Sequence, residues 1–282
     1  LWQFVERAAR EPVTEKLFQE CFGLDFARAQ QQLAAYLPEA MSEPLVLRPP
    51  QRPRLPDYPI RAATELEVAR LKGDWERMEI AFVKSEFPGL APKYLDQTRR
   101  TLMRAYDRGN RDPHLLAVLG LCEIDGGNDA GARDFLEAAA ATKTPLRPRA
   151  WIELARLRFA ALRAPGADPA DRLTAEQTST VLAPLSAARE QSPPLAETYD
   201  LLAEVWSAST AKPTRDDLAV LEEGVRYFPR RSELVYRTAD LNLRSGFPDA
   251  ARWQIALGLT FAPDAATRAR FEGLRPRLEA MR

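Results

Sequence analysis

The residue types that most often carry catalysis are sparse in this 282-residue sequence. It has one histidine, His114, and two cysteines, Cys21 and Cys122, whose separation matches no metal-binding spacing. A zinc site needs three or four ligands, often His or Cys, and no His-Glu-x-x-His motif is present. We therefore expect His114 to be a polar residue at the start of a helix and both thiols to be buried and inert.

Phosphate-binding and acid–base chemistry are also poorly supported. The segment "DGGND" at 125–129 is glycine-rich, but it lacks the lysine and the preceding strand of a phosphate-binding loop. The many carboxylates fall where helix surfaces are expected, and there they usually serve as solvated groups or i,i+4 ion pairs. We therefore predict that this chain has no catalytic, cofactor-binding or metal-binding residues and is not an enzyme.

The charge balance excludes two classes of partner. Lys plus Arg and Asp plus Glu both total 40, so no net field draws the chain to nucleic acid or to an anionic membrane. No apolar run approaches the ~20 residues that span a bilayer. We expect no nucleic-acid partner and no membrane insertion. The sequence leaves the compartment and the oligomeric state open.

A repeated pattern of small and large residues organises the second half of the chain. Small residues at Gly120, Ala155, Ala203 and Ala239 recur at spacings of 35, 48 and 36 residues. Later in each unit a large apolar residue is followed three residues on by a small one and then by a proline: Leu136, Ala139, Pro145; Leu185, Ala188, Pro193; Leu221, Gly224, Pro229; Ile255, Gly258, Pro263. The pattern in each unit therefore predicts two amphipathic helices.

The small residues and the caps explain how such helices would pair. Antiparallel helices approach closely only where small side chains cross, and Gly120 with Ala132 and Ala239 with Ala251 are candidates. Proline ends the second helix, because it disfavours a helical conformation in the preceding residue. Asp112 before Pro113, "TAEQ" at 174–177 and "TRDD" at 214–217 are helix-start signals.

These units resemble the tetratricopeptide (TPR) repeats, a family of 34-residue helix–turn–helix units. Residues 113–145 and 231–263 match best, whereas Thr238 replaces a leucine of the family pattern and one unit carries a 14-residue insertion. The resemblance implies an all-α fold: a right-handed α-solenoid of stacked antiparallel hairpins over 60–282, ending in a capping helix after Asp264. It also implies that the first helix of each unit lines a concave face on which a protein or peptide binds.

The region before the clear repeats is predicted in three parts. Residues 60–112 continue helical, with a hairpin that turns at Gly73–Asp74 and closes at Pro88. Residues 42–59 contain six prolines and indicate a semi-rigid linker or, alternatively, a ligand for an SH3-like partner. Residues 1–41 predict three short helices, Trp2–Arg10, Thr14–Cys21 and Asp25–Leu37. They are similar to the helical tail of gluzincin-type zinc peptidase domains, which implies that a catalytic-type domain precedes Leu1.

Projection from the small residue of each first helix gives the residues expected to face inward. They are His114, Ala117 and Leu121; Arg149, Ile152 and Arg156; Glu197, Asp200 and Glu204; and Tyr236, Asp240 and Arg244. In one interpretation Arg149 and Arg156 only bridge to Glu197 or Asp200 between units. In the other, the last three groups of residues form a polar groove for an extended segment of mixed charge, with Ile152 and Tyr236 as apolar anchors.

Two functional hypotheses follow from the sequence. The first is a protein-protein interaction scaffold that binds a protein or peptide on the concave face of a helical repeat array. The alternative is the accessory C-terminal region of a larger zinc-peptidase-like protein, whose catalytic motif would lie upstream of this chain. A free-standing hydrolase is disfavoured, because no nucleophile–base constellation is present.

Overall fold

The chain folds into helices. The computed structural model describes residues 1–8, 11, 13–42, 60–142, 144–163 and 172–281. Within these ranges it contains helices α1 to α15, no β-strand, and an isolated bridge between Leu173 and Ser209. The predicted all-α fold is confirmed. In the same ranges, no helix has both the length and the apolar character that crossing a membrane requires.

Three helices form the N-terminal part: α1 (Trp2–Ala8), α2 (Glu15–Phe22) and α3 (Phe26–Ser42). The rings of Phe4, Phe18, Phe22 and Phe26 pack together between them. Helix α3 continues through Pro38 instead of ending at Leu37 as expected. This helix therefore tolerates the loss of the backbone hydrogen bond that proline cannot donate. The likeness of this part to a peptidase tail stays a prediction, as does the linker, which apart from Ser42 lies outside the described residues.

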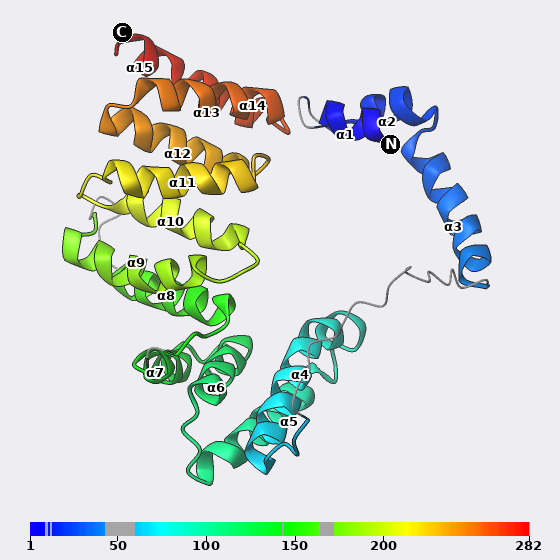
Figure 1. Cartoon of the computed structure of the whole chain (residues 1–282), viewed down its shortest axis with the longest axis vertical. Coiled ribbons are helices and arrows are strands. Elements are labelled where there is room, and N and C mark those ends of the chain that lie inside the picture. Colours follow the sequence, from blue (N-terminus) through cyan, green and yellow to red (C-terminus); the bar gives the residue numbers. More distant parts are fainter. Residues whose placement is uncertain (9–10, 12, 43–59, 143, 164–171, 282) are drawn as a thin grey trace.

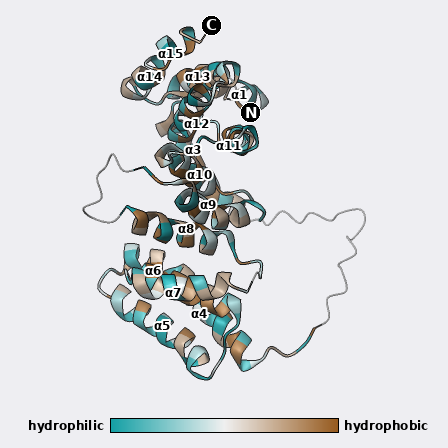
Figure 2. Cartoon of the chain, turned by 90° about the vertical axis from the view of Figure 1, so that its left-hand side faces the viewer, coloured by the Kyte–Doolittle hydropathy of each residue, from teal (hydrophilic) through white to brown (hydrophobic). Residues whose placement is uncertain are grey.

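Five antiparallel hairpins follow and stack in chain order (Figure 1). They pair α4 (Glu65–Glu86) with α5 (Ala91–Asp107), α6 (Pro113–Asp125) with α7 (Asp129–Ala140), α8 (Pro148–Leu162) with α9 (Ala175–Arg189), α10 (Ala196–Ala208) with α11 (Arg215–Tyr227), and α12 (Ser232–Ser245) with α13 (Pro248–Phe261). One hydrophobic cluster runs from Leu116 in α6 to Phe271 near the C-terminus. Figure 2 views the same stack from the side, and hydrophobic residues recur in its hairpins.

Small residues lie where the paired helices cross, as predicted. A Cβ atom added to Gly120 would come within 2.5 Å of Leu136 Cγ. Ala239 and Ala251 are both fully buried in one cluster shared by α12 and α13. The spacing of small residues in the sequence therefore reports the contact between helices, because no larger side chain fits there.

The predicted turn at Gly73–Asp74 is wrong, because α4 runs straight through it. A Cβ atom on Gly73 would lie 2.4 Å from Leu102 Cδ2, so this glycine is the crossing point of α4 with α5. The chain turns instead at 87–90, around the predicted closing residue Pro88. Gly73 has the same role as Gly120: the missing side chain lets the paired helix approach closely, and the chain does not turn there.

The helix starts predicted from capping residues are confirmed. Asp112 accepts a hydrogen bond from the His114 backbone N–H at 2.8 Å, and Thr174 and Thr214 both form complete capping boxes. Asp264 caps α14 (Ala265–Glu272), but the C-terminal segment contains a second helix, α15 (Arg275–Glu279), instead of continuing as one. The ring of Pro276 would clash with the carbonyl of Glu272 in a continuous helix, and α14 ends at that residue.

The first helices of the hairpins line one side of the stack. Helix α4 contacts α6, and the same relation continues from α6 to α8, α10, α12 and α14. Each second helix contacts the first helix of the next hairpin instead. Neighbouring units are closest on the inside of a curved array, so the first helices form its concave side. The right-handed sense of the solenoid stays a prediction.

Candidate functional site

Ion pairs link successive hairpins along the first helices. In each pair the acid lies on α10 or α12, and the arginine comes from a later part of the chain. We call this set the acid-to-arginine ladder; it comprises Asp200–Arg231, Glu204–Arg237 at 3.2 Å, Glu233–Arg270 at 2.8 Å and Asp240–Arg277 at 2.5 Å. The ladder runs from α10 to α15 and places alternating charges on the concave side.

A pocket of about 460 Å³ opens between α10 and α12 within this ladder. Its polar wall is made by two rungs of the ladder, Asp200–Arg231 and Glu204–Arg237. The residues that line this α10–α12 pocket are Asp200, Glu204, Arg230, Arg231, Ser232, Glu233, Leu234 and Arg237. A cavity with both charges at its wall can pair with a ligand of either sign.

Two charged groups of the pocket, Arg231 and Glu233, are held in their ionised forms. The hydrogen bond to Asp200 raises the pKa of Arg231. Burial raises the pKa of Glu233, but hydrogen bonds from Arg270 and Arg237 outweigh burial and hold that pKa below its usual value. The side chain of Arg231 is still 52% exposed. The pocket therefore presents fixed charges that remain open to solvent and to a partner.

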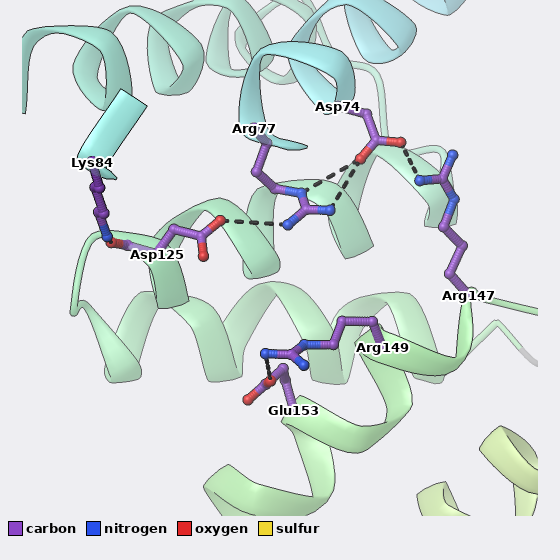
Figure 3. Close-up of polar contacts among 7 residues, drawn as sticks. All are labelled: Asp74, Arg77, Lys84, Asp125, Arg147, Arg149 and Glu153. Atoms are coloured by element: carbon purple, nitrogen blue, oxygen red, sulfur yellow. Dashed lines mark hydrogen bonds and ion pairs between the residues drawn. The ribbon is translucent and has the colours of Figure 1, made fainter. Parts of the chain in front are cut away.

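The predicted bridges of Arg149 and Arg156 to Glu197 or Asp200 are wrong. Both guanidinium groups contact Glu153 of their own helix, at 2.7 and 2.8 Å, and Figure 3 shows the Arg149 pair. Three- and four-residue spacings on one helix bring side chains together without crossing to another unit. Asp200 instead pairs with Arg231, in the next hairpin.

Ile152 is also corrected, because it is completely buried in the main cluster. Helix α8 contacts α6, α7, α9 and α10, and these helices cover the side expected to face the groove. Ala117 and Leu121 of α6 are also buried, because α6 is surrounded by α4, α5, α7 and α8. Ile152 is therefore a core residue and cannot anchor a ligand.

The remaining predicted residues lie on or beside the ladder, except His114, which is half-buried at the start of α6. Tyr236 is half-buried, with its ring edge-on to Phe271 at 5.6 Å and the Arg270 guanidinium 4.2 Å from its centroid. Asp240 is buried and pairs with Arg244 as well as with its ladder partner. Glu197 is half-buried and adds to the negative charge around Arg231.

Apart from Asp240, the buried carboxylates are not singled out by the sequence pattern. Asp74 in α4 contacts Arg77 at 3.4 Å and Arg147 at 2.5 Å, and Arg77 reaches Asp125 of α6 at 3.4 Å (Figure 3). Lys84 donates to the Asp125 backbone carbonyl at 3.1 Å. A usable signal is nevertheless present in the sequence. An acid directly follows the small crossing residue in three first helices, at Gly73–Asp74, Ala203–Glu204 and Ala239–Asp240.

The two thiols differ in their surroundings. Cys122 is 1% exposed, and burial, followed by the nearby carboxylates of Glu123 and Asp125, raises its pKa to about 12. Its predicted inertness fits this environment. Cys21 is only half-buried, which differs from the expected burial. Among the described residues, no group of three or more His, Cys, Asp or Glu is placed to hold a metal ion.

Comparison with known proteins finds only a remote structural likeness. No family model matches the sequence, and no curated protein does. Among solved structures, a thermophilic TPR protein of Thermus thermophilus aligns with 73% of this chain and 99% of its own, at 17% identity and a TM-score of 0.40. A likeness at that score is too remote to carry an argument. The TPR-like helical repeat fold stands on the hairpins and crossings described above.

Proposed function

We propose that this helical repeat scaffold binds an extended protein or peptide segment of mixed charge in the α10–α12 pocket and along the neighbouring first helices. The observation that carries the proposal is the acid-to-arginine ladder on the concave side, with a pocket open between two of its rungs. The proposed binding surface takes in Asp200, Glu204, Tyr236, Asp240 and Arg244 from the sequence prediction, together with Arg231 and Arg237.

The ladder can exchange partners at low cost. An ion pair between exposed side chains contributes only about 0–1 kcal/mol, because water screens it and both side chains lose freedom. A carboxylate on a bound segment can therefore form an ion pair with Arg231 or Arg237 in place of Asp200 or Glu204. A basic side chain of the segment can then pair with the carboxylate that has lost its arginine. The exchange conserves ion pairs, while the segment buries apolar area against the half-buried ring of Tyr236.

This arrangement favours specificity through charge order. A segment whose acids and bases alternate in step with the ladder keeps every charge paired, whereas a shifted segment places like charges together. Because the interactions are electrostatic and partly exposed, affinity should fall with ionic strength. The proposal requires no bound cofactor and no reaction.

A binding experiment with defined probes tests this function. Immobilised twelve-residue peptides of acidic, basic and alternating charge are incubated with the full chain, with Arg231→Ala/Arg237→Ala, and with the control Arg215→Ala/Arg252→Ala. The control removes two arginines of the second helices α11 and α13 whose side chains are 50% and 47% exposed, so it removes the same charge from outside the ladder. We expect alternating peptides to bind best and the ladder variant to lose at least tenfold in affinity. Equal binding by both variants would refute the proposed surface.

A further inference from the structure

Helix α4 is apolar on two opposite sides. On the inner side, Gly73 and Ile80 are buried. On the outer side five large apolar side chains are each half or more exposed; we call Val68, Leu71, Trp75, Met78 and Phe82 the α4 stripe. Their exposed fractions run from 50% for Val68 to 66% for Trp75. A helix with two apolar sides is suited to lie between two layers.

The spacing of the stripe resembles that of a coiled-coil seam. Its members follow one another at intervals of three and four residues, as positions a and d of a heptad do. With 3.6 residues per turn, this seam falls on the side of α4 opposite Gly73. The main contacts of α4 in the described chain are with α5 and α6, on the inner side.

The two ends of the array differ in how they are covered. At the C-terminal end, α14 and α15 place Phe271, Leu274 and Leu278 over the last hairpin, and all three are buried. At the opposite end the α4 stripe is open. Terminal units of a repeat array need a polar outer face to stay soluble, and a continuous exposed apolar patch marks an interaction site.

We propose that the α4 stripe is the interface of a homodimer, in which α4 of a second copy packs antiparallel against it. Matching the a and d positions of the two helices places Trp75 beside Met78 of the second copy and Leu71 beside Phe82 of the second copy. Twofold symmetry makes each of these contacts twice. A thioether against an aromatic ring is a favourable packing in such layers.

Charge complementarity identifies the occupant as a second copy. Lys72 and Glu79 are seven residues apart and lie along the same edge of the stripe. Antiparallel packing places Lys72 of each chain next to Glu79 of the other. The carboxylate of Glu79 is already held at this edge by the Trp75 Nε1–H, at 2.7 Å, and by the Tyr94 hydroxyl.

Helix α3 of the same chain is the competing occupant. It also exposes apolar residues, including Leu33, Tyr36 and Leu37. Its seam is flanked by uncharged side chains such as Gln30 and Gln32, so it offers no complement to Lys72 and Glu79. The charges of α4 therefore favour a partner that carries the same charges in reverse order.

The first test measures mass against concentration by sedimentation equilibrium. We expect the full chain to approach twice its 31.7 kDa mass. Leu71→Glu/Met78→Glu should remain a monomer with an unchanged helical circular dichroism spectrum. Trp253→Glu is the matched control, because Trp253 is 48% exposed on α13, away from the stripe, and it should leave the dimer intact.

The second test uses charge exchange. Lys72→Glu and Glu79→Lys should each lose about tenfold or more in dimer affinity, because like charges then meet at the interface. An equimolar mixture of the two variants should recover the dimer, since each supplies the charges that the other needs. Tyr94→Phe controls for the hydroxyl contact that Glu79→Lys also removes.

Three outcomes would overturn the proposal. One is a chain that stays monomeric at every concentration, which is also the result expected if α3 covers the stripe within one molecule. Another is a dimer that survives Leu71→Glu/Met78→Glu. The last is a pair of charge variants that do not recover dimerisation when mixed.

Discussion

The aromatic ring of Tyr199 lies directly on Gly224. A Cβ atom at Gly224 would come 2.4 Å from Tyr199 Cδ1 and 2.5 Å from its Cγ, so the ring occupies the space that any other residue would need. The Tyr199 hydroxyl donates to Glu223 Oε1 at 2.6 Å, and Arg189 holds the same carboxylate at 3.0 and 3.1 Å. One tyrosine thus connects three helices, α9, α10 and α11.

Gly224→Ala should destabilise the array. The added methyl group must displace the ring, and overpacking of this kind costs about 1–3 kcal/mol, of which better helix propensity offsets about 1 kcal/mol. Urea unfolding followed by circular dichroism measures the difference. Gly89→Ala is the matched control, because apart from its chain neighbours no atom lies within 4 Å of the position that its methyl group would take, so its midpoint should not fall. Identical midpoints for both variants would contradict the close packing of Tyr199 on Gly224.

Tyr199 should also make stability sensitive to alkaline pH. Burial, and then the hydrogen bond to Glu223, raises the pKa of Tyr199 above its usual 10.0. Below pH 10 the tyrosine is neutral in both states; above it the unfolded chain ionises first, so stability is lost as pH rises toward the folded pKa. Each pH unit in that window is worth about 1.4 kcal/mol.

The comparison with Tyr199→Phe isolates this effect, because phenylalanine keeps the ring and cannot ionise. Urea unfolding at pH 8 and pH 11 should show the wild-type chain losing about 1 kcal/mol more than the variant between the two values. Lysines and the other tyrosines titrate in both proteins and cancel in the difference. An equal loss in both would mean that Tyr199 is not buried as a neutral group.

The hairpins are predictable from the sequence because close packing constrains residue size. Residues at helix crossings must be small, as Gly120 and Ala239 are. The spacing of such small residues along the chain therefore already indicates where the helices cross. The same rule applies at Gly73, but the following aspartate makes the pair resemble a turn. A buried acid beside a glycine can be interpreted only when its partner Arg147 is known to lie nearby, and that arginine is more than seventy residues away in sequence.

The candidate site is less predictable than the fold. A projection along one helix gives the direction of a side chain but does not show which side chains the next hairpin covers. For this reason the projection places Ile152 on the surface, although it lies in the core. Such a projection also cannot rank competing partners. It does not identify Glu153, four residues further along the same helix, as the partner of Arg149. It also does not find Arg231 and Arg237, because these arginines belong to a later unit than the acids they contact.

Cys122 should be protected from thiol reagents in the folded chain. Its burial and its pKa of about 12 leave almost no thiolate at pH 8. In a Cys21→Ser background, Ellman's reagent should detect no fast-reacting thiol in the native protein and one thiol in denaturant. Rapid native labelling of that variant would show that α6 is not enclosed between α5 and α7.

Glu153 gives the last prediction, because it is a buried acid that depends on two exposed arginines. Its side chain is 6% exposed, whereas those of Arg149 and Arg156 are 51% and 41% exposed. Arg149→Ala/Arg156→Ala leaves the carboxylate buried without these partners, at a cost of about 1–3 kcal/mol in the free energy of unfolding. Adding Glu153→Gln removes the stranded charge and should restore part of the stability. If the triple variant is no more stable than the double one, the arginines stabilise the array by packing alone, and Glu153 is not the group that requires them.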